Sequence, residues 1–587
     1  MKPDVVLRAG TICDGTGAPP RTGDVVITGD RIVQVGGRSP RARKDVDAAG
    51  LVVAPGFIDV HTHYDAQVTW DRLLTPSCWH GVTSVVVGNC GFALAPCRVA
   101  DRERLLRMLE HVEGMPYESL AAGVTWTWES IPEYFDMLRA EPLGLNVGVL
   151  LGHSTIRSYV LGAEAYEREA TEDETRRMQE LVREGMAAGA LGLGTSFSPG
   201  HVGEGGWPVP SRAASRDELR ALVRAMGGRG VLEITPATFP IEAEELAWLQ
   251  ALSRETGCAV SFSAVLDLPD RDGVWEPVFE RIREGNATGA RVVAQVSCRP
   301  MRFDFDLSTG CASLDAAPCW RRFRETRDRW AQRTLLTDAE FRETFRRETI
   351  GRPDAPSSRR WTNVTLEETG HAPDRRFIGR PLGEIAQERG GDVIDTLFDL
   401  AADADLHARF SMLLLNYDDD RVGALLRQPE GLIALSDAGA HASILCDAGY
   451  ATHLLGHWVR ERRLFPVEEA VRRLTSMPAE VYRIPDRGRL VAGAVADVTC
   501  FDPARVAMRA AERVRDLPGD AERWVTKSDG VVHVFVAGEP LLAHGTWTGR
   551  RGGGSLARAR LKRGVRGKNR CLPRAAMDNV VRSEQAT

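Results

Sequence analysis

The feature that most constrains this chain is a regular alternation of short apolar strands with longer helical stretches across residues 55–487. Helix signals lie between the strands, as where Ser215 precedes acidic residues at the start of an expected helix over 217–226. Eight such units favour an α/β fold of the (β/α)8 TIM-barrel type, although the same signals also fit a doubly wound open sheet. The expected barrel strands cover 57–60, 82–87, 145–151, 190–194, 230–234, 258–262, 291–296 and 431–435.

The two ends of the chain carry strands of a different kind. They are short β-branched runs punctuated by Gly and Asp, which is typical of a small sheet. We infer that both ends pair into one β-sandwich domain, 1–54 plus 488–546, with the barrel inserted between them. The expected strands of this domain cover 4–8, 24–28, 31–36, 495–501 and 531–537.

Two further segments differ in composition from the barrel. The stretch 300–425, between the seventh and eighth barrel strands, is too long for a structureless loop and is expected to be an inserted subdomain. From Arg550 to Arg574 there are ten Lys or Arg residues and no acidic residue. Such a composition predicts that 547–587 is a basic flexible tail.

Charge and cysteine usage limit the partners and the compartment. The 587 residues include 75 Lys and Arg against 81 Asp and Glu, and this mildly negative balance gives no reason to expect nucleic acid or an acidic membrane as a partner. No apolar run is long enough for a transmembrane helix, and Asp4 and Arg8 interrupt the first apolar stretch, so no signal peptide is expected. The eleven cysteines form no C-x-x-C pair, which fits a reducing cytoplasm. The oligomeric state is left open.

The first barrel strand ends in a His-x-His motif, His61-Thr62-His63. Because alternate residues of a strand share one face, both imidazoles should point to the same side. At the carboxyl end of a barrel strand that side is the active-site mouth, so the pair is a candidate metal-binding site. The alternative is two histidines that only form hydrogen bonds at a strand end.

Two more motifs follow strand ends. Asp437, after the last strand, should lie beside the first strand when the barrel closes, where a carboxylate can bind a divalent cation and accept a proton from water. Its alternative role is to cap the next helix. Cys90 follows the second strand, where a thiolate could bind metal. Its alternative role is that of a small buried residue in a Gly-rich turn.

Four segments, PGFIDVHTHYD, HGVTSVVVGNCG, SDAGAH and LTSMPAEVYRIPDRGRLVAGAVADVTCFDP, resemble the amidohydrolase superfamily and, within it, the N-acyl-D-amino-acid deacylase (D-aminoacylase) group. The resemblance spans about residues 4–545. It implies a barrel with a β-sandwich, one or two divalent metal ions such as Zn2+, and hydrolysis of the amide of an acylated amino acid. Carried over by position, His61 and His63 are first-strand ligands, Cys90 bridges the metals, and Asp437 is the ligand that transfers protons.

The sequence departs from that group at two strands. The group places metal-binding histidines at the ends of the fifth and sixth strands, whereas 231–236 and 260–263 contain none here. No lysine ends the fourth strand either. Glu233, on the fifth strand, could supply an oxygen ligand instead, or it could face the barrel wall in an ion pair.

Three more residues are candidates for the substrate pocket. His153 and His201 follow the third and fourth strands, and each could instead be a histidine that only forms structural hydrogen bonds. Arg299, after the seventh strand, could hold a substrate carboxylate, or it could be a structural arginine.

The predicted function is metal-dependent hydrolysis of a C–N amide bond in an N-acyl amino acid, with N-acyl-D-amino acids in first place. His61, His63 and Asp437 would hold a divalent ion, and Asp437 would also act as the catalytic base. One alternative is another reaction of the superfamily, namely cyclic amide or imide hydrolysis, deamination or decarboxylation. Another is a metal-poor binding protein without catalysis.

Overall fold

The computed structural model describes residues 2–203, 206–268, 271–307, 317–326, 328–349, 361–442 and 445–556. Its centre is a parallel eight-stranded sheet in the order β16-β12-β11-β10-β9-β8-β7-β6. All six residues of β7 are buried, as in a parallel strand that is covered on both faces. The strands are β6 (Phe57–Asp59), β7 (Val82–Val87), β8 (Asn146–Gly152), β9 (Gly192–Ser196), β10 (Val231–Thr235), β11 (Ala259–Phe262), β12 (Val292–Val296) and β16 (Gly431–Ile433).

The first and last strands of this sheet meet. A parallel bridge joins Thr62 to Ala438, and the backbone N–H of His63 donates to the carbonyl of Ala438 at 2.8 Å. The Ser436 hydroxyl also donates to the carbonyl of His61 at 3.1 Å. These contacts close the sheet into a barrel, so the predicted TIM barrel is confirmed and the open-sheet alternative is wrong.

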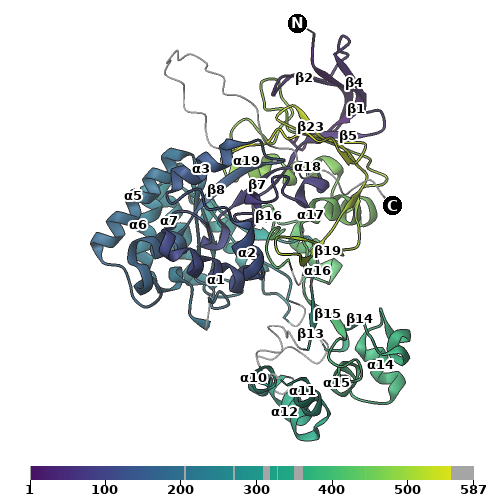
Figure 1. Cartoon of the computed structure of the whole chain (residues 1–587). Coiled ribbons are helices and arrows are strands. Elements are labelled where there is room, and N and C mark those ends of the chain that lie inside the picture. The colour runs from purple at the N-terminus through teal and green to yellow at the C-terminus, as the bar shows by residue number, and fades with distance from the viewer. Residues whose placement is uncertain are drawn as a thin grey trace, which may run out of the picture.

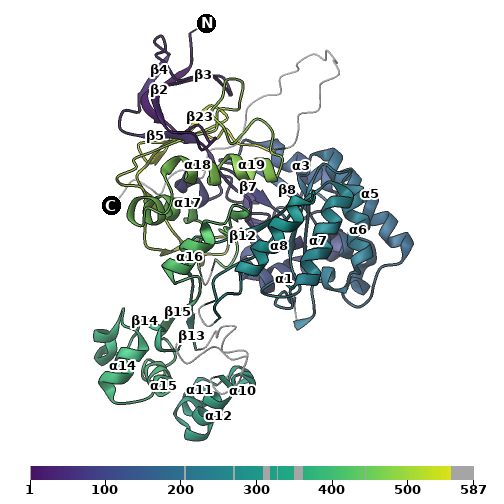
Figure 2. The same cartoon turned by 180° about the vertical axis from the view of Figure 1, so that it is seen from behind.

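Helices surround the barrel strands (Figures 1 and 2). Local sequence explains where several of them begin, because Ser130 and Thr171 form capping boxes with Glu133 and Glu174. Among the described residues, no helix has the length and apolar content needed to cross a membrane. The helices around the barrel are α1 (Arg102–Glu113), α2 (Tyr117–Gly123), α3 (Ile131–Ala140), α4 (His153–Leu161), α5 (Glu172–Ala188), α6 (Arg216–Ala225), α7 (Ala243–Thr256), α8 (Glu276–Ala287), α16 (Asp419–Leu426), α17 (Tyr450–His453), α18 (Val467–Leu474) and α19 (Ser476–Val481).

A nine-stranded sheet combines strands from both ends of the chain, in the order β24-β23-β22-β17-β5-β1-β2-β3 with β4 beside β1. The two ends join where β5 and β17 pair antiparallel, with Val498 opposite Pro55. Figure 1 shows this sheet at one end of the barrel, near the N-terminus. Its strands are β1 (Val5–Ile12), β2 (Arg21–Thr28), β3 (Arg31–Val35), β4 (Lys44–Asp47), β5 (Val52–Pro55), β17 (Val498–Phe501), β22 (Val531–Val536), β23 (Glu539–Ala543) and β24 (Thr546–Trp547).

The described residues of 301–415 form a separate lobe below the barrel (Figure 1). It has its own hydrophobic cluster, in which Trp320, Phe345 and Phe398 are fully buried. The lobe joins the barrel through β13 and β15, which pair Met301 with Leu415 at their barrel end. Its elements are β13 (Met301–Asp306), α10 (Pro318–Glu325), α11 (Arg329–Thr337), α12 (Ala339–Thr349), β14 (Thr365–Glu368), α14 (Leu382–Arg389), α15 (Val393–Asp403) and β15 (Arg409–Leu415).

The boundary predicted for the flexible tail, residue 547, lies too early in the chain. Gly553 exchanges two backbone hydrogen bonds with Leu143, at 2.8 and 2.9 Å, and the N–H of Leu556 donates to the carbonyl of Val147 at 2.8 Å. A side chain at Gly553 would lie 2.2 Å from the carbonyl oxygen of Leu145, so only glycine fits there. Residues 553–556 are therefore packed on the barrel, and Trp547 pairs with Leu542 in the nine-stranded sheet. The rest of the predicted tail, 557–587, lies outside the described residues.

Candidate metal centre

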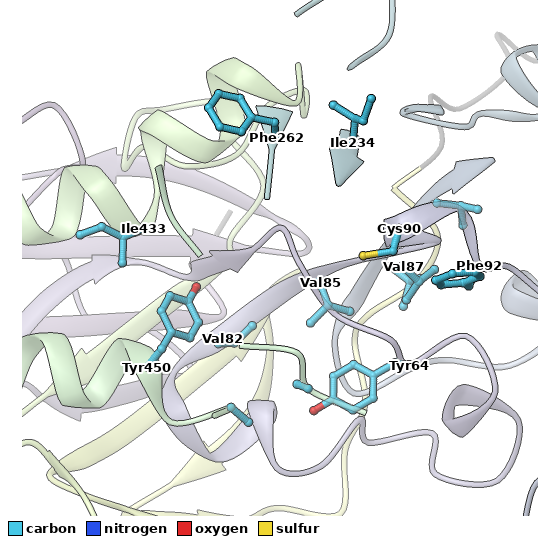
Figure 3. Packing of buried hydrophobic residues seen from close by; sticks show 14 of the residues in the cluster. Tyr64, Val82, Val85, Val87, Cys90, Phe92, Ile234, Phe262, Ile433 and Tyr450 are labelled. Atoms are coloured by element: carbon cyan, nitrogen blue, oxygen red, sulfur yellow. The ribbon is translucent and has the colours of Figure 1, made fainter. Parts of the chain in front are cut away.

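The carboxyl ends of the barrel strands open into a cavity of about 320 Å3. His61 and His63 reach it from the chain after β6, Cys90 from the turn after β7, and Asp437 from the chain after β16. Cys90 also contributes to the apolar packing around Val85, Val87 and Phe92 (Figure 3). Because parallel strands end at one edge, motifs that are far apart in sequence meet here.

The potential ligand atoms of these four side chains lie close together. Asp437 Oδ1 lies 3.3 Å from His61 Nε2 and 3.8 Å from His63 Nε2. Cys90 Sγ lies 3.6 Å from His61 Nε2. The ligand atoms of His61, His63 and Cys90 all lie within 4.8 Å of one another, and these three residues are buried. Nitrogen, sulfur and carboxylate oxygen at this spacing fit a Zn2+-like cation.

The other ring nitrogen of His61 is held by an amide. His61 Nδ1 lies 2.6 Å from Gln295 Oε1, and Gln295 Nε2 donates to the hydroxyl of Ser261 at 3.1 Å. This network orients the amide so that its oxygen accepts a hydrogen bond from the Nδ1–H of His61. The lone pair of His61 Nε2 then faces Asp437 and Cys90, which is the tautomer that a metal ligand requires.

A carboxylate lies beside the other ring nitrogen of His63, within ion-pair distance but without a hydrogen bond. His63 Nδ1 lies 3.1 Å from Oε1 of Glu113, the last residue of α1, which is buried. The carbonyl of Glu113 also accepts the backbone N–H of His441. No sequence motif singled out Glu113, because an acidic residue at a helix end far from any strand end is ordinary.

Burial favours the neutral forms of His63, Cys90 and Glu113. The pKa of His63 lies well below 6.5, first because of burial and then because of the charges of His61, His441 and His201, so the imidazole is neutral. Burial, followed by nearby carboxylates, raises the pKa of the Cys90 thiol and of Glu113 well above their usual values. A bound cation would reverse this effect and favour the thiolate, so the group of side chains is suited to a cation.

Glu233 lies beside this group and supports the Cys90 turn. Its Oε2 accepts the backbone N–H of Cys90 at 2.7 Å, and its Oε1 accepts the hydroxyl of Ser263 at 3.2 Å. Cys90 has a φ of 55°, an unusual value for a residue with a side chain, so the turn needs such support. Glu233 Oε1 is 3.8 Å from His61 Nδ1, and its role as a metal ligand stays a prediction.

Two of the predicted pocket residues lie elsewhere. His153 is fully buried between Thr195 Oγ1 at 2.8 Å and Glu218 Oε1 at 2.9 Å, and it does not line the cavity. The cause is its position as the first residue of α4, which places the ring against the neighbouring helix. Arg299 does not line the cavity either, because its guanidinium pairs with Asp447 Oδ1 at 2.7 Å.

Three further polar residues, two histidines and one aspartate, also line the cavity. His201 lines the cavity, with Nδ1 2.7 Å from Ser196 Oγ, and burial lowers its pKa to about 4, while its contact with substrate stays a prediction. His441 and Asp447 line it as well, and the sequence-based prediction missed both. His441 could have been noticed, since it ends the same SDAGAH motif as Asp437.

A closed parallel barrel with histidine, cysteine and aspartate donors at its carboxyl-end mouth defines a metal-dependent TIM-barrel enzyme. The sequence profile of the amidohydrolase family matches residues 44–302 and 364–542, and the chain belongs to that family. The resemblance to the D-aminoacylase group is confirmed by its relatives. The chain is 30% identical over 566 residues to D-aminoacylase from Alcaligenes xylosoxydans xylosoxydans, covering 94% of this chain and 98% of the relative.

Solved structures agree with this assignment. A D-aminoacylase structure that is described by its binuclear metal centre superposes with a TM-score of 0.64 at 27% identity, covering 95% of this chain and 100% of that chain. An N-acyl-D-glutamate deacylase from Bordetella bronchiseptica superposes with a TM-score of 0.63 at 27% identity and equal coverage. That structure holds zinc and a phosphonate mimic of the tetrahedral intermediate.

Proposed function

We propose that this chain is a metal-dependent deacylase that hydrolyses the amide of an N-acyl amino acid, with N-acyl-D-amino acids as its first substrates. The observation that carries the proposal is the convergence of His61, His63, Cys90 and Asp437 on one cavity. D-aminoacylase and N-acyl-D-glutamate deacylase are similar to the chain over more than nine-tenths of its length, which supports the substrate class.

The metal would be Zn2+, in one or two sites. His61 Nε2, His63 Nε2, Cys90 and Asp437 would hold it, because their ligand atoms already lie close together. Gln295 hydrogen-bonds the other nitrogen of His61, and Glu113 lies beside that of His63. When bound, a divalent ion supplies Lewis acidity to the scissile carbonyl and lowers the pKa of the attacking water. The lack of histidines on β10 and β11 makes the number of metal ions a separate question for measurement.

The side chains of the site would supply the proton transfers. Asp437 faces the cavity with its side chain 23% exposed, so it can accept a proton from the attacking water. Water adds to the carbonyl carbon, the C–N bond breaks, and Asp437 returns its proton to the leaving amine. The products are a carboxylate and a free amino acid. His201 is a neutral imidazole at neutral pH and can hydrogen-bond to the substrate.

We also propose the domain division 1–54 plus 488–546 for the β domain and 55–487 for the barrel, with the lobe at about 300–425 inserted into the barrel. The shared nine-stranded sheet and the separate hydrophobic cluster of the lobe support these boundaries. A cytoplasmic location is supported by the nine described cysteines, which are all free. We expect a small-molecule substrate and no nucleic-acid partner.

The decisive experiment combines metal analysis with a substrate panel. Purified protein, supplemented with Zn2+ or Co2+ during expression, should retain metal and release free amine from N-acetyl-D-amino acids. N-acetyl-L-amino acids and a cyclic imide are the matched comparison substrates. Turnover of the imide alone would favour another reaction of the family, and metal-free protein without turnover would favour a binding protein.

A further inference from the structure

The cavity wall around the candidate metal centre is poor in positive charge. Among the described residues that line it there is no Lys or Arg, whereas Glu113, Asp437 and Asp447 contribute carboxylates. Much of the remaining wall is apolar, with Met301 and Leu415 at the base of the inserted lobe. Of the undescribed residues, 204–205, 269–270, 308–316 and 443–444 contain no Lys or Arg, whereas 327, 350–360 and 557–587 do.

Two arginines approach the lining without joining it. Arg212 donates to the backbone carbonyls of Pro199 and His201, both at 3.3 Å. Arg299 donates to the carbonyl of Cys446 at 2.7 Å and pairs with Asp447 at 2.7 Å. The second pair is well shielded, since the side chain of Arg299 is 14% exposed and that of Asp447 is 9% exposed.

Which member of the Arg299–Asp447 ion pair lines the cavity decides the sign of the charge that a bound molecule meets. Asp447 lines the cavity and Arg299 does not, so the pair presents its carboxylate to the cavity and not its guanidinium. A substrate carboxylate that enters here loses its water and meets a like charge instead of a cation. All N-acyl amino acids share one α-carboxylate, so only a second, side-chain carboxylate distinguishes the acidic substrates.

We propose that Asp447 is a specificity-determining residue. By pairing with Arg299 it withholds the guanidinium from the cavity, and the enzyme is thereby selective for N-acyl amino acids with uncharged side chains. This inference rests on the proposed deacylase function and specifies which N-acyl amino acids the enzyme prefers. Acidic substrates such as N-acyl glutamates are discriminated against because none of the described residues that line the cavity offers a cation to their second carboxylate.

The test compares two substrates of nearly equal shape, N-acetyl-D-glutamine and N-acetyl-D-glutamate. The metal-loaded full-length enzyme should prefer the glutamine substrate by about 100-fold or more in kcat/KM. Asp447→Asn keeps the shape of the side chain but releases Arg299, so the glutamate reaction should rise and the preference should fall by about 10-fold or more. The double variant Asp447→Asn/Arg299→Met is the control, and it should lose this gain.

Several outcomes would overturn the inference. One is equal turnover of both substrates by the wild-type enzyme. Another is an equal gain for both substrates in Asp447→Asn, which would assign Arg299 to the shared α-carboxylate. If the wild type hydrolyses neither substrate, the proposed function itself fails. Should Asp447→Asn not fold, Met301→Lys adds a cation to the lining, and an unchanged glutamine preference there would contradict the charge argument.

Discussion

His63 Nδ1 lies 3.1 Å from Glu113 Oε1, so a helix in the connection between β7 and β8 orients a histidine that follows β6. His61 has a neutral counterpart, the amide of Gln295. A carboxylate behind an imidazole raises its basicity more than an amide does. The two candidate ligands of the His-x-His motif are therefore supported unequally, and His63 should be the stronger donor.

Glu113→Gln should weaken metal binding. The amide keeps the shape of the side chain but cannot take on the negative charge that a bound cation would favour at Glu113, so metal affinity should fall by about 10-fold to 100-fold. Competition with a chelator for Co2+ measures the affinity without reference to turnover. Glu103→Gln, at an exposed position of the same helix, is the control and should bind as the wild type does. Equal affinities in both variants would assign Glu113 a merely structural role.

His61→Ala and His63→Ala should each remove metal and abolish turnover while the fold survives. Each deletes a nitrogen donor from the group around Asp437. Metal analysis and kcat of the purified variants measure the loss of metal and turnover, and circular dichroism checks that the fold survives. Full kcat with normal metal content in either variant would refute the site.

Asp437→Asn should reduce kcat more than it reduces metal content. The amide still offers one oxygen to a cation but cannot accept a proton from water, so kcat should fall by about 100-fold or more. Single-turnover rates at matched metal occupancy separate chemistry from binding. If kcat remains near normal, the base lies elsewhere, and His201 or Glu113, which also line the cavity, would be tested next.

Cys90→Ser distinguishes a metal ligand from a turn residue. A neutral hydroxyl replaces the thiolate poorly, so metal should be lost first and activity should follow it. The Glu233 contact is to the backbone of Cys90 and survives the substitution, which makes serine a clean probe. Unchanged metal content would show that Cys90 serves only the packing of the turn.

Lowering the pH should destabilise the fold through His80. This ring is fully buried between Thr452 Oγ1 and the carbonyl of Thr526, and burial lowers its pKa to about 4. Since the unfolded histidine has a pKa near 6.5, the unfolded state takes up the proton first, and stability is lost as pH falls from about 6.5 towards 4. Urea unfolding at pH 7.5 and 5.0 should differ by about 2 kcal/mol more in the wild type than in His80→Gln.

Truncation should separate the packed end of the chain from the rest. Removal of 557–587 should leave kcat/KM nearly unchanged. Removal of 550–587 also deletes Gly553 and Leu556, whose contacts hold the chain on β8, and should lower the melting temperature. Leu556→Ala in the full chain should destabilise the fold by about 2–5 kcal/mol, because that side chain is 3% exposed. Equal melting temperatures of the two truncated proteins would contradict the packing.

The sequence by itself determined the barrel and the motifs at its strand ends. Apolar runs and turn residues are local signals, so all eight strands appear close to their predicted positions. His61 and His63 share a strand end, and Asp437 and Cys90 follow other strand ends, so barrel topology alone brings them together. The tail boundary was misplaced, because Gly552–Gly554 look flexible in isolation, whereas the backbones of Gly553 and Gly554 bond to those of Leu143 and Val147.

Only the tertiary structure decided what surrounds these motifs. Glu113 reaches His63, Gln295 reaches His61, and Asp447 pairs with Arg299, across separations of about 50 to 230 residues in sequence. His153 followed a strand end as the motif residues do, yet it turns away to Glu218 on α6. Such contacts depend on how helices and connections pack around the barrel, and packing joins side chains that share no local pattern.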